Sequence, residues 1–197
     1  MSHAKLQMHR RSLRRLGFIV AVLSAPLLSV PESAHAAGGG SCTKPLCIEF
    51  QAPEAFLSEA FGGQVPAPQV LNLDDAAQAK ISAVFNRSFP QARVRYWQQG
   101  DRTAWIFDDI GKKGYVPTTA GFVVRAGGQL DYARVLQYRE SRGEQVGEPS
   151  FLTQLSGARD TGSGLDVQVD NISGATLSVQ MMQRMVRTAL VLDSLVR

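Results

Sequence analysis

The stretch TTAGFVVRAGGQLDYARVLQY, residues 118–138, decides the class of fold. Residues 118–125 and 129–138 are rich in β-branched, aromatic and leucine side chains, and the turn-forming residues 126–128 separate them. Two such runs joined by a short Gly-rich turn are typical of an antiparallel hairpin. We therefore expect two long neighbouring strands here.

The same pattern precedes this hairpin. Residues 94–97 and 103–107 flank the turn Gln99-Gly100-Asp101. No helix-length segment separates any of these strands, whereas a parallel pair needs a crossover connection of about a dozen residues or more. The sheet is therefore expected to be an antiparallel meander that begins at residue 93.

Apolar residues recur at helical spacing on both sides of the meander. They predict a short helix at 53–61, a second that begins at Asp74 or Asp75 and ends before Phe89, and a long amphipathic helix at 178–195. Residues 151–155 predict a short helix or turn, and the alternation at 165–170 predicts a last strand. The predicted class is α+β, an antiparallel sheet packed against helices.

The first 36 residues have the composition of a targeting segment. A basic start is followed by an apolar run at 17–30 and by Ala34-His35-Ala36, which together predict a signal peptide at 1–36. The run is shorter than the roughly 20 residues that span a bilayer, so an uncleaved anchor is the less favoured alternative. Arg10-Arg11 leaves the twin-arginine route open. We expect export to the periplasm or cell envelope.

Charge and histidine content exclude several functions. Five of the 21 basic residues and one of the 17 acidic residues lie in the leader, so the rest of the chain is formally neutral and shows no nucleic-acid footprint. All three histidines also lie in the leader. The exported part therefore cannot hold a Ser-His-Asp or Cys-His catalytic site or a histidine-bound metal. We expect no catalytic residues and no metal site.

The two cysteines, Cys42 and Cys47, follow the leader closely. In an exported protein such a pair is expected to form a disulfide. A lipoprotein anchor at Cys42 is the alternative, but Gly39-Gly40-Ser41 places no apolar residue before it. Two cysteines without further Cys or His cannot complete a zinc or iron–sulfur site.

The motif DNISGATLS, residues 170–178, joins the predicted last strand to the last helix. Gly174 and Ala175 are small enough for another group to approach the backbone closely. The free N–H groups and the dipole at a helix start favour an anion, and Thr176 places a hydroxyl where a phosphate would lie. Asp170, just before the turn, can accept N–H bonds that stiffen it.

Asp170, Ser173, Gly174, Ala175 and Thr176 together resemble the flavinylation motif of FMN-binding domains. That family includes flavin-carrying components of the Na+-translocating NADH:quinone reductase and of the Rnf complex. The resemblance implies that a flavin transferase joins FMN through a phosphoester bond to Thr176, at the turn before the C-terminal helix. Ser173 or Thr176 acting only as a helix cap is the alternative.

A second segment extends the resemblance. Arg139-Glu140-Ser141-Arg142-Gly143 is similar to a Glu-Thr-x-Gly segment that follows a strand in the same family. This implies that Glu140, Ser141 and Arg142 lie against the flavin. For Arg142 an ion pair with Glu140 or Glu144 is nearly as well supported.

Other residues could serve the flavin or simply the core. Trp97, Trp105 and Tyr138 could stack on the flavin, although packing within the sheet is favoured. The methionines at 181, 182 and 185 are interpreted as adaptable core. Lys112-Lys113 is interpreted as a solvated turn rather than a docking site for an acidic partner.

The resemblance implies the organisation and function of the chain. We expect a signal peptide at 1–36, an N-terminal extension with helices at 37–92, and an FMN-binding domain at 93–197. The expected function is that of an exported electron-transfer flavoprotein, reduced by a membrane redox protein, rather than a stand-alone enzyme. The alternative is a non-redox envelope module for binding or sensing that uses the same fold.

Overall fold

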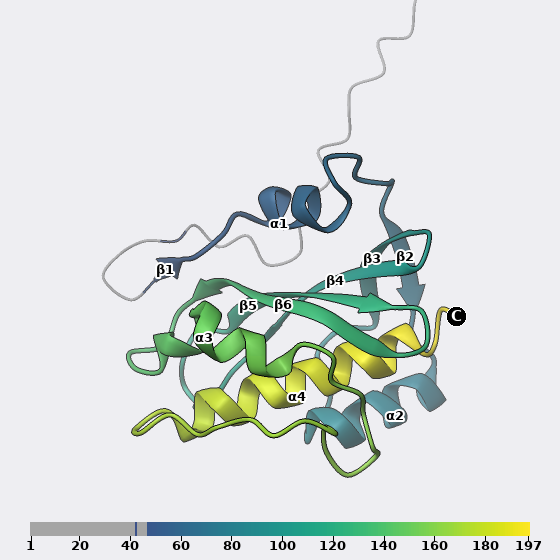
Figure 1. Ribbon diagram of the computed structural model, residues 1–197. Coiled ribbons are helices and arrows are strands. Elements are labelled where there is room, and N and C mark those ends of the chain that lie inside the picture. Colours follow the sequence, from purple (N-terminus) through teal and green to yellow (C-terminus); the bar gives the residue numbers. More distant parts are fainter. Residues whose placement is uncertain (1–41, 43–46) are drawn as a thin grey trace, which may run out of the picture. The chain divides into compact units, whose positions relative to one another are not determined.

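The sheet predicted from residues 93–138 forms the centre of the structure, a computed structural model that describes Cys42 and residues 47–197 (Figure 1). Six antiparallel strands lie in the order β1-β6-β5-β4-β3-β2. The strands are β1 (Ile48–Glu49), β2 (Gln69–Asn72), β3 (Arg93–Gln99), β4 (Arg102–Asp109), β5 (Thr118–Arg125) and β6 (Gln129–Tyr138). The predicted signal peptide at 1–36 lies outside the described residues.

The meander from β3 to β6 is confirmed. Trp105 lies opposite Tyr96 on one side and opposite Phe122 on the other, and Phe122 lies opposite Ala133. The turns need glycine, because Gly100 and Gly127 have φ angles of +60° and +91°, which cost a side-chain-bearing residue energy. Strand alternation and turn chemistry therefore agree in specifying this register.

The edge strands β1 and β2 were not predicted. Both come from the segment expected as an N-terminal extension, and they complete the same sheet beside β6 and β3. Val70 in β2 is 55% exposed and Ile48 in β1 is 43% exposed. Because these strands bury little, their sequences lack the apolar alternation by which a strand is recognised.

Helices cover both faces of the sheet. Figure 1 shows α1 (Pro53–Ala60) on one face and α2 (Asp75–Phe85) beside α4 (Thr176–Asp193) on the other. Along β4, Ala104 and Ile106 belong to the cluster under α1, whereas Trp105 and Phe107 belong to the larger cluster under α2 and α4. This arrangement confirms the predicted α+β class.

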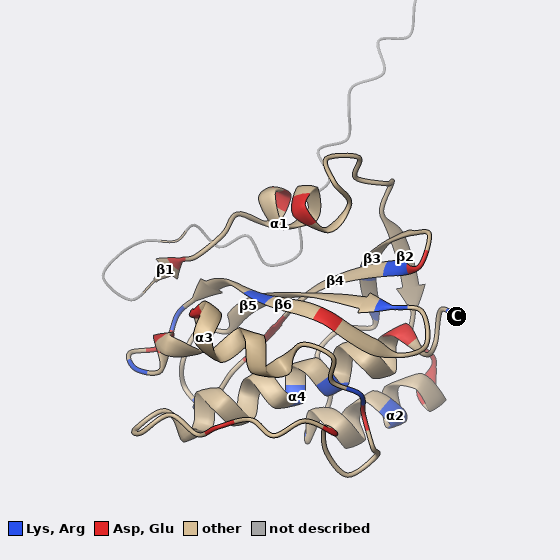
Figure 2. Ribbon diagram, viewed as in Figure 1, with Lys and Arg blue, Asp and Glu red and all other residues tan. Residues whose placement is uncertain are grey.

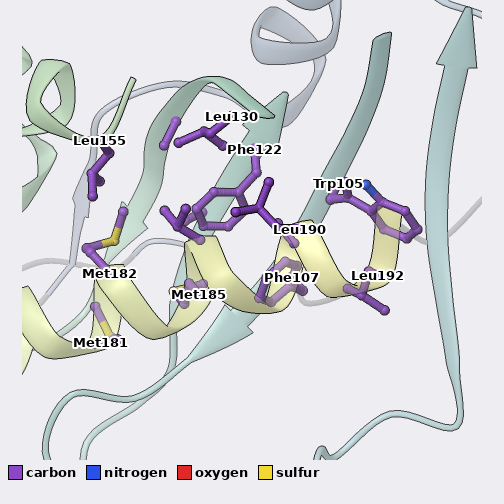
Figure 3. Close-up of a cluster of buried hydrophobic side chains, with 14 of the residues drawn as sticks. Trp105, Phe107, Phe122, Leu130, Leu155, Met181, Met182, Met185, Leu190 and Leu192 are labelled. Carbon is purple, nitrogen blue, oxygen red and sulfur yellow. The ribbon is translucent and has the colours of Figure 1, made fainter. Parts of the chain in front are cut away.

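The core under α4 contains the methionines that the sequence analysis assigned to packing. Met181, Met182 and Met185 are fully buried, and Figure 3 shows them on α4 beside Phe122 and Leu155. Unbranched methionine side chains fill irregular gaps between a helix and a twisted sheet. The core interpretation is therefore confirmed.

The long helix begins two residues earlier than predicted, at Thr176. Asp74 caps α2 by accepting a hydrogen bond of 2.8 Å from the Ala77 N–H, as its position suggested. Residues 151–155 are indeed helical, within α3 (Pro149–Leu152) and a 3-10 turn at Thr153–Leu155. None of the described helices is both long and apolar enough to cross a membrane.

The prediction of a strand at 165–170 was wrong. This segment is irregular, and its one ladder contact is an isolated bridge between Leu165 and Asp160. Leu165, Val167 and Val169 are half-buried against the main core. Their alternation therefore reflects packing of every second side chain against the helical layer, without a neighbouring strand to pair with.

The predicted disulfide is present. Cys42 and Cys47 are bonded to each other, and Cys47 is buried at the start of β1. Because β1 pairs with β6 through Ile48 and Tyr138, the bonded Cys47 lies near the point where β6 leaves the sheet.

Candidate functional site

A cleft of about 550 Å³ opens where three segments meet: the β4–β5 loop, the loop after β6, and the start of α4. It is lined by Lys112, Tyr115, Glu140, Ser141, Arg142, Gly174, Ala175, Thr176, Leu177 and Ser178. Six of the eight predicted cofactor-binding residues therefore lie around one cavity. The other two, Asp170 and Ser173, do not line it.

At the start of α4 the N–H groups of Ala175 and Ser178 are hydrogen-bonded to backbone carbonyls, whereas those of Thr176 and Leu177 have no partner in the described structure. Ala175 occupies the cap position and supplies no side-chain cap, and no acidic residue lies in the first turn. Figure 2 shows that the charged residues of α4 lie further along the helix. The first turn of α4 therefore contributes no carboxylate of its own to oppose the positive end of the helix dipole, and Glu140 is the one carboxylate among the residues that line the cleft.

Gly174 and Thr176 present open space and a hydroxyl at this helix end. Gly174 has φ +79°, and a Cβ there would meet no atom within 4 Å. The Thr176 side chain is exposed, and its Oγ1 accepts a hydrogen bond of 3.0 Å from the Asn171 amide. This bond orients the hydroxyl and leaves the Thr176 proton free to be donated.

The loop after β6 contributes a buried carboxylate and an exposed guanidinium. Glu140 accepts a hydrogen bond of 2.6 Å from the Gly111 N–H, which fixes the β4–β5 loop against it. Arg142 is exposed. Within residues 47–197 its guanidinium forms no ion pair with Glu140 or Glu144, so it is available to an anion in the cleft.

Tyr138 and Ser178 join this loop to α4. The Tyr138 hydroxyl donates to the Arg142 carbonyl and lies 2.9 Å from Ser178 Oγ. Gly143 packs so closely here that a Cβ would lie 2.8 Å from both Ser178 Cβ and the Tyr138 hydroxyl. Burial raises the pKa of Tyr138 to about 12, so the phenol stays protonated as a donor. These contacts hold together the loop after β6 and the start of α4, which form two walls of the cleft.

An ionic cluster around the buried Asp109 supports the third wall. Arg184 of α4 donates to Asp109 Oδ2 at 2.8 Å and to the Ile110 carbonyl at 3.0 Å. Arg87 also pairs with Asp109, whose side chain is fully buried. Burial lowers the pKa of Arg184. The cluster ties the end of β4, and hence the β4–β5 loop, to α4.

The predicted residues that do not line the cleft have other positions. Asp170 is exposed, and its backbone N–H donates to the Gln154 side chain at 2.8 Å. Ser173 is exposed on the turn before Gly174. Trp105 is fully buried and stacks on Tyr96 with a centroid separation of 5.0 Å. The packing interpretation of the sheet aromatics therefore holds for Trp105.

Sequence reasoning missed Tyr115 and Leu177 and assigned Lys112 to a solvated turn. Tyr115 is the one aromatic among the lining residues, and its hydroxyl lies 2.9 Å from Ser141 Oγ. Its sequence context could have indicated a site residue, because Tyr115 is the aromatic residue of the polar, Gly-rich segment 111–117. Leu177 gave no such signal, because its 49% exposure is known only from the structure.

Comparison with protein families gave a match to the FMN-binding domain over residues 111–191. Searches of curated proteins and of solved structures gave no significant match. The matched residues lie within the predicted domain at 93–197 and include every residue that lines the cleft. Residues 111–191 of this chain therefore form an FMN-binding domain.

Proposed function

We propose that this protein carries FMN through a phosphoester bond to the Thr176 hydroxyl and serves as an electron-transfer carrier in the bacterial cell envelope. The observation that carries the proposal is the position of Thr176. Its exposed hydroxyl stands at the uncapped start of α4, inside the cleft of an FMN-binding domain. The export signal predicted at 1–36 supports the location.

The residues of the cleft suit the parts of FMN. A volume of about 550 Å³ lies within the range of roughly 300–1,000 Å³ that is usual for ligand sites. The helix N–H groups and Arg142 suit a phosphate, while Tyr115 and Leu177 offer apolar surface to a flat aromatic ring. When bound, the flavin supplies the capacity to accept and release electrons, and the protein supplies orientation and electrostatic tuning.

Other hydroxyls near the cleft are poorer acceptors. Ser178 is only 3% exposed and is engaged with Tyr138. Ser141 is engaged with Tyr115, and Ser173 does not line the cleft. For Thr176, ester formation removes the Oγ1 proton and makes an Oγ1–phosphorus bond. In the same step the phosphoanhydride bond of an activated flavin nucleotide, presented by a flavin transferase, breaks; its second phosphoryl group leaves and the Oγ1 proton passes to a base or to water.

The chemistry of the cleft favours a carrier over a substrate-transforming enzyme. Its one carboxylate, Glu140, is occupied by the Gly111 N–H, and the cleft contains no histidine. A reaction on an organic substrate would need a positioned acid or base, whereas electron exchange does not. A membrane redox protein is the proposed electron donor.

The experiment is to co-express the exported protein with a flavin transferase, denature it, and record in-gel flavin fluorescence and intact mass. We expect the wild type and, more weakly, Thr176→Ser to be fluorescent with the mass of an FMN ester. Thr176→Ala should fold but remain dark. Ser173→Ala is the matched control and should stay fluorescent.

Two outcomes would contradict the proposal. A fluorescent Thr176→Ala band would assign the bond to another hydroxyl. A wild-type protein that stays dark, while a known flavinylated protein is labelled in the same cells, would favour the non-redox binding or sensory module.

A further inference from the structure

The β4–β5 loop, residues 110–117, forms a wall of the cleft that is fixed at two points. At one point the Gly111 N–H donates to Glu140, and a Cβ on Gly111 would lie 3.0 Å from Glu140 Oε1 and 3.2 Å from the Leu177 carbonyl. At the other, the Tyr115 hydroxyl is 2.9 Å from Ser141 Oγ. The loop is therefore held against both other walls rather than projecting freely.

The side chains of this wall differ in chemistry from those of the other two. Among the lining residues Tyr115, in this wall, is the one aromatic side chain, and Leu177, at the start of α4, is the one large aliphatic side chain. The groups suited to a phosphate are the N–H groups at the start of α4 and Arg142, in the other two walls, and Lys112 in this one. A ligand whose phosphate lies at the start of α4, beside Thr176, finds its one aromatic partner among the lining residues at Tyr115.

Lys112 places a positive charge beside this aromatic surface. Its ammonium lies 5.6 Å from the centroid of the Tyr115 ring, and the residue is exposed. A cation a few ångströms from a redox group favours the form that carries more negative charge. Reduction adds negative charge to a flavin ring, so a cation here raises the reduction potential.

We propose that Tyr115 packs against the isoalloxazine ring of FMN and that Lys112 sets its reduction potential. This inference rests on the proposed function for the presence of FMN, but not on the covalent bond. Tyr115 is hydrogen-bonded to Ser141, and Lys112 directly follows Gly111, whose N–H donates to Glu140. The β4–β5 loop is therefore the element that tunes the flavin.

Tyr115→Phe tests the ring contact. A phenol in contact with a flavin quenches its fluorescence, because it donates an electron to the photo-excited ring and recovers it in the dark. Phenylalanine keeps the packing surface but is too hard to oxidise. We expect a several-fold longer fluorescence lifetime in Tyr115→Phe. Tyr132→Phe is the matched control, because Tyr132 lies under α1 and its hydroxyl has no hydrogen-bond partner in the described structure.

Lys112→Gln tests the charge. The midpoint potential of the flavin should become more negative, whereas Lys113→Gln should leave it unchanged. Lys113 is the matched control because it is also exposed and is adjacent in sequence but does not line the cleft. Equal shifts of the midpoint potential in the two lysine variants would overturn the specific role of Lys112. For the preceding test, equal fluorescence lifetimes in wild type and Tyr115→Phe would overturn the ring contact.

A measurement with free FMN separates this inference from the attachment proposal. Thr176→Ala protein, which lacks the proposed acceptor, is titrated with FMN, and fluorescence is recorded. Quenching that is lost in Thr176→Ala/Tyr115→Phe supports the ring contact even if no covalent flavin is ever found. Unquenched FMN at protein concentrations that saturate binding, or no binding at all, overturns it.

Discussion

Gly143 offers a quantitative test of how the cleft walls are held together. Its φ of +95° is in the left-handed region, and a Cβ would lie 2.8 Å from Ser178 Cβ and from the Tyr138 hydroxyl, with Ser178 Oγ closer still. Gly127 has a similar φ of +91°, but a Cβ there would meet no atom within 4 Å. The two glycines thus share a backbone requirement and differ in packing.

The magnitudes follow from this difference. Left-handed backbone costs an alanine about 1–2 kcal/mol, and overpacking a tight contact adds about 1–3 kcal/mol. We therefore expect Gly143→Ala to lose about 2–5 kcal/mol of unfolding free energy and Gly127→Ala about 1–2 kcal/mol. For a domain of this size the Tm would fall by about 4–20 °C and about 2–8 °C, respectively.

Urea unfolding followed by circular dichroism measures both variants. Adding Ser178→Ala to Gly143→Ala removes the nearest obstructing atom and should recover part of the loss. Below its Tm, Gly143→Ala should also accept flavin more slowly than Gly127→Ala, because the loop after β6 no longer seats against α4. Equal losses of unfolding free energy in the two glycine variants would refute the close contact.

Two further predictions concern buried polar groups. Asp109→Asn removes the buried carboxylate between Arg87 and Arg184 and should cost about 3–5 kcal/mol in urea unfolding. Asp131→Asn breaks two partly exposed pairs, with Arg102 and Arg125, and should cost no more than about 1 kcal/mol; similar costs would contradict the burial of Asp109. Because burial raises the pKa of Tyr138 from 10.0 to about 12, the folded state keeps this proton after the unfolded state loses it. The contribution of Tyr138 is complete below about pH 10 and is lost between about pH 10 and pH 12, so the stability advantage of wild type over Tyr138→Phe should shrink there; an advantage that stays constant would contradict the shift.

The fold could be predicted where strand-forming residues and turn residues both favour the pairing that the sheet adopts. The β5–β6 hairpin combines strong strand formers with a Gly127-Gly128 turn, and its pairing follows. Strand β2 carries an exposed Val70 and buries little, so periodicity could not reveal it. Residues 165–170 alternate because they pack on helices, and periodicity alone cannot distinguish that from a strand.

The same reasoning applies to the site. The motif could be recognised because its residues, Gly174, Ala175 and Thr176, are contiguous in sequence with the helix start that forms the expected anion site. Tyr115 meets Ser141 across 26 residues, and Gly111 meets Glu140 across 29. Such contacts depend on the sheet register and on the closure of the loop, which no local pattern encodes.

The geometry of the cleft explains why a covalent bond would be needed at all. The cleft is open, Thr176 is exposed, and each charge–dipole contact at a helix start contributes only about 0.3–1 kcal/mol. Contacts of this size hold a free cofactor weakly, and an exported protein that released FMN would lose it by dilution. A bond to Thr176 converts binding into an intramolecular event, for which effective concentrations reach roughly the millimolar range. Under the proposed attachment, weak contacts of Arg142 with the phosphate and of Tyr115 and Lys112 with the ring would be sufficient to orient and tune the flavin, and the site would remain open to the proposed redox partner.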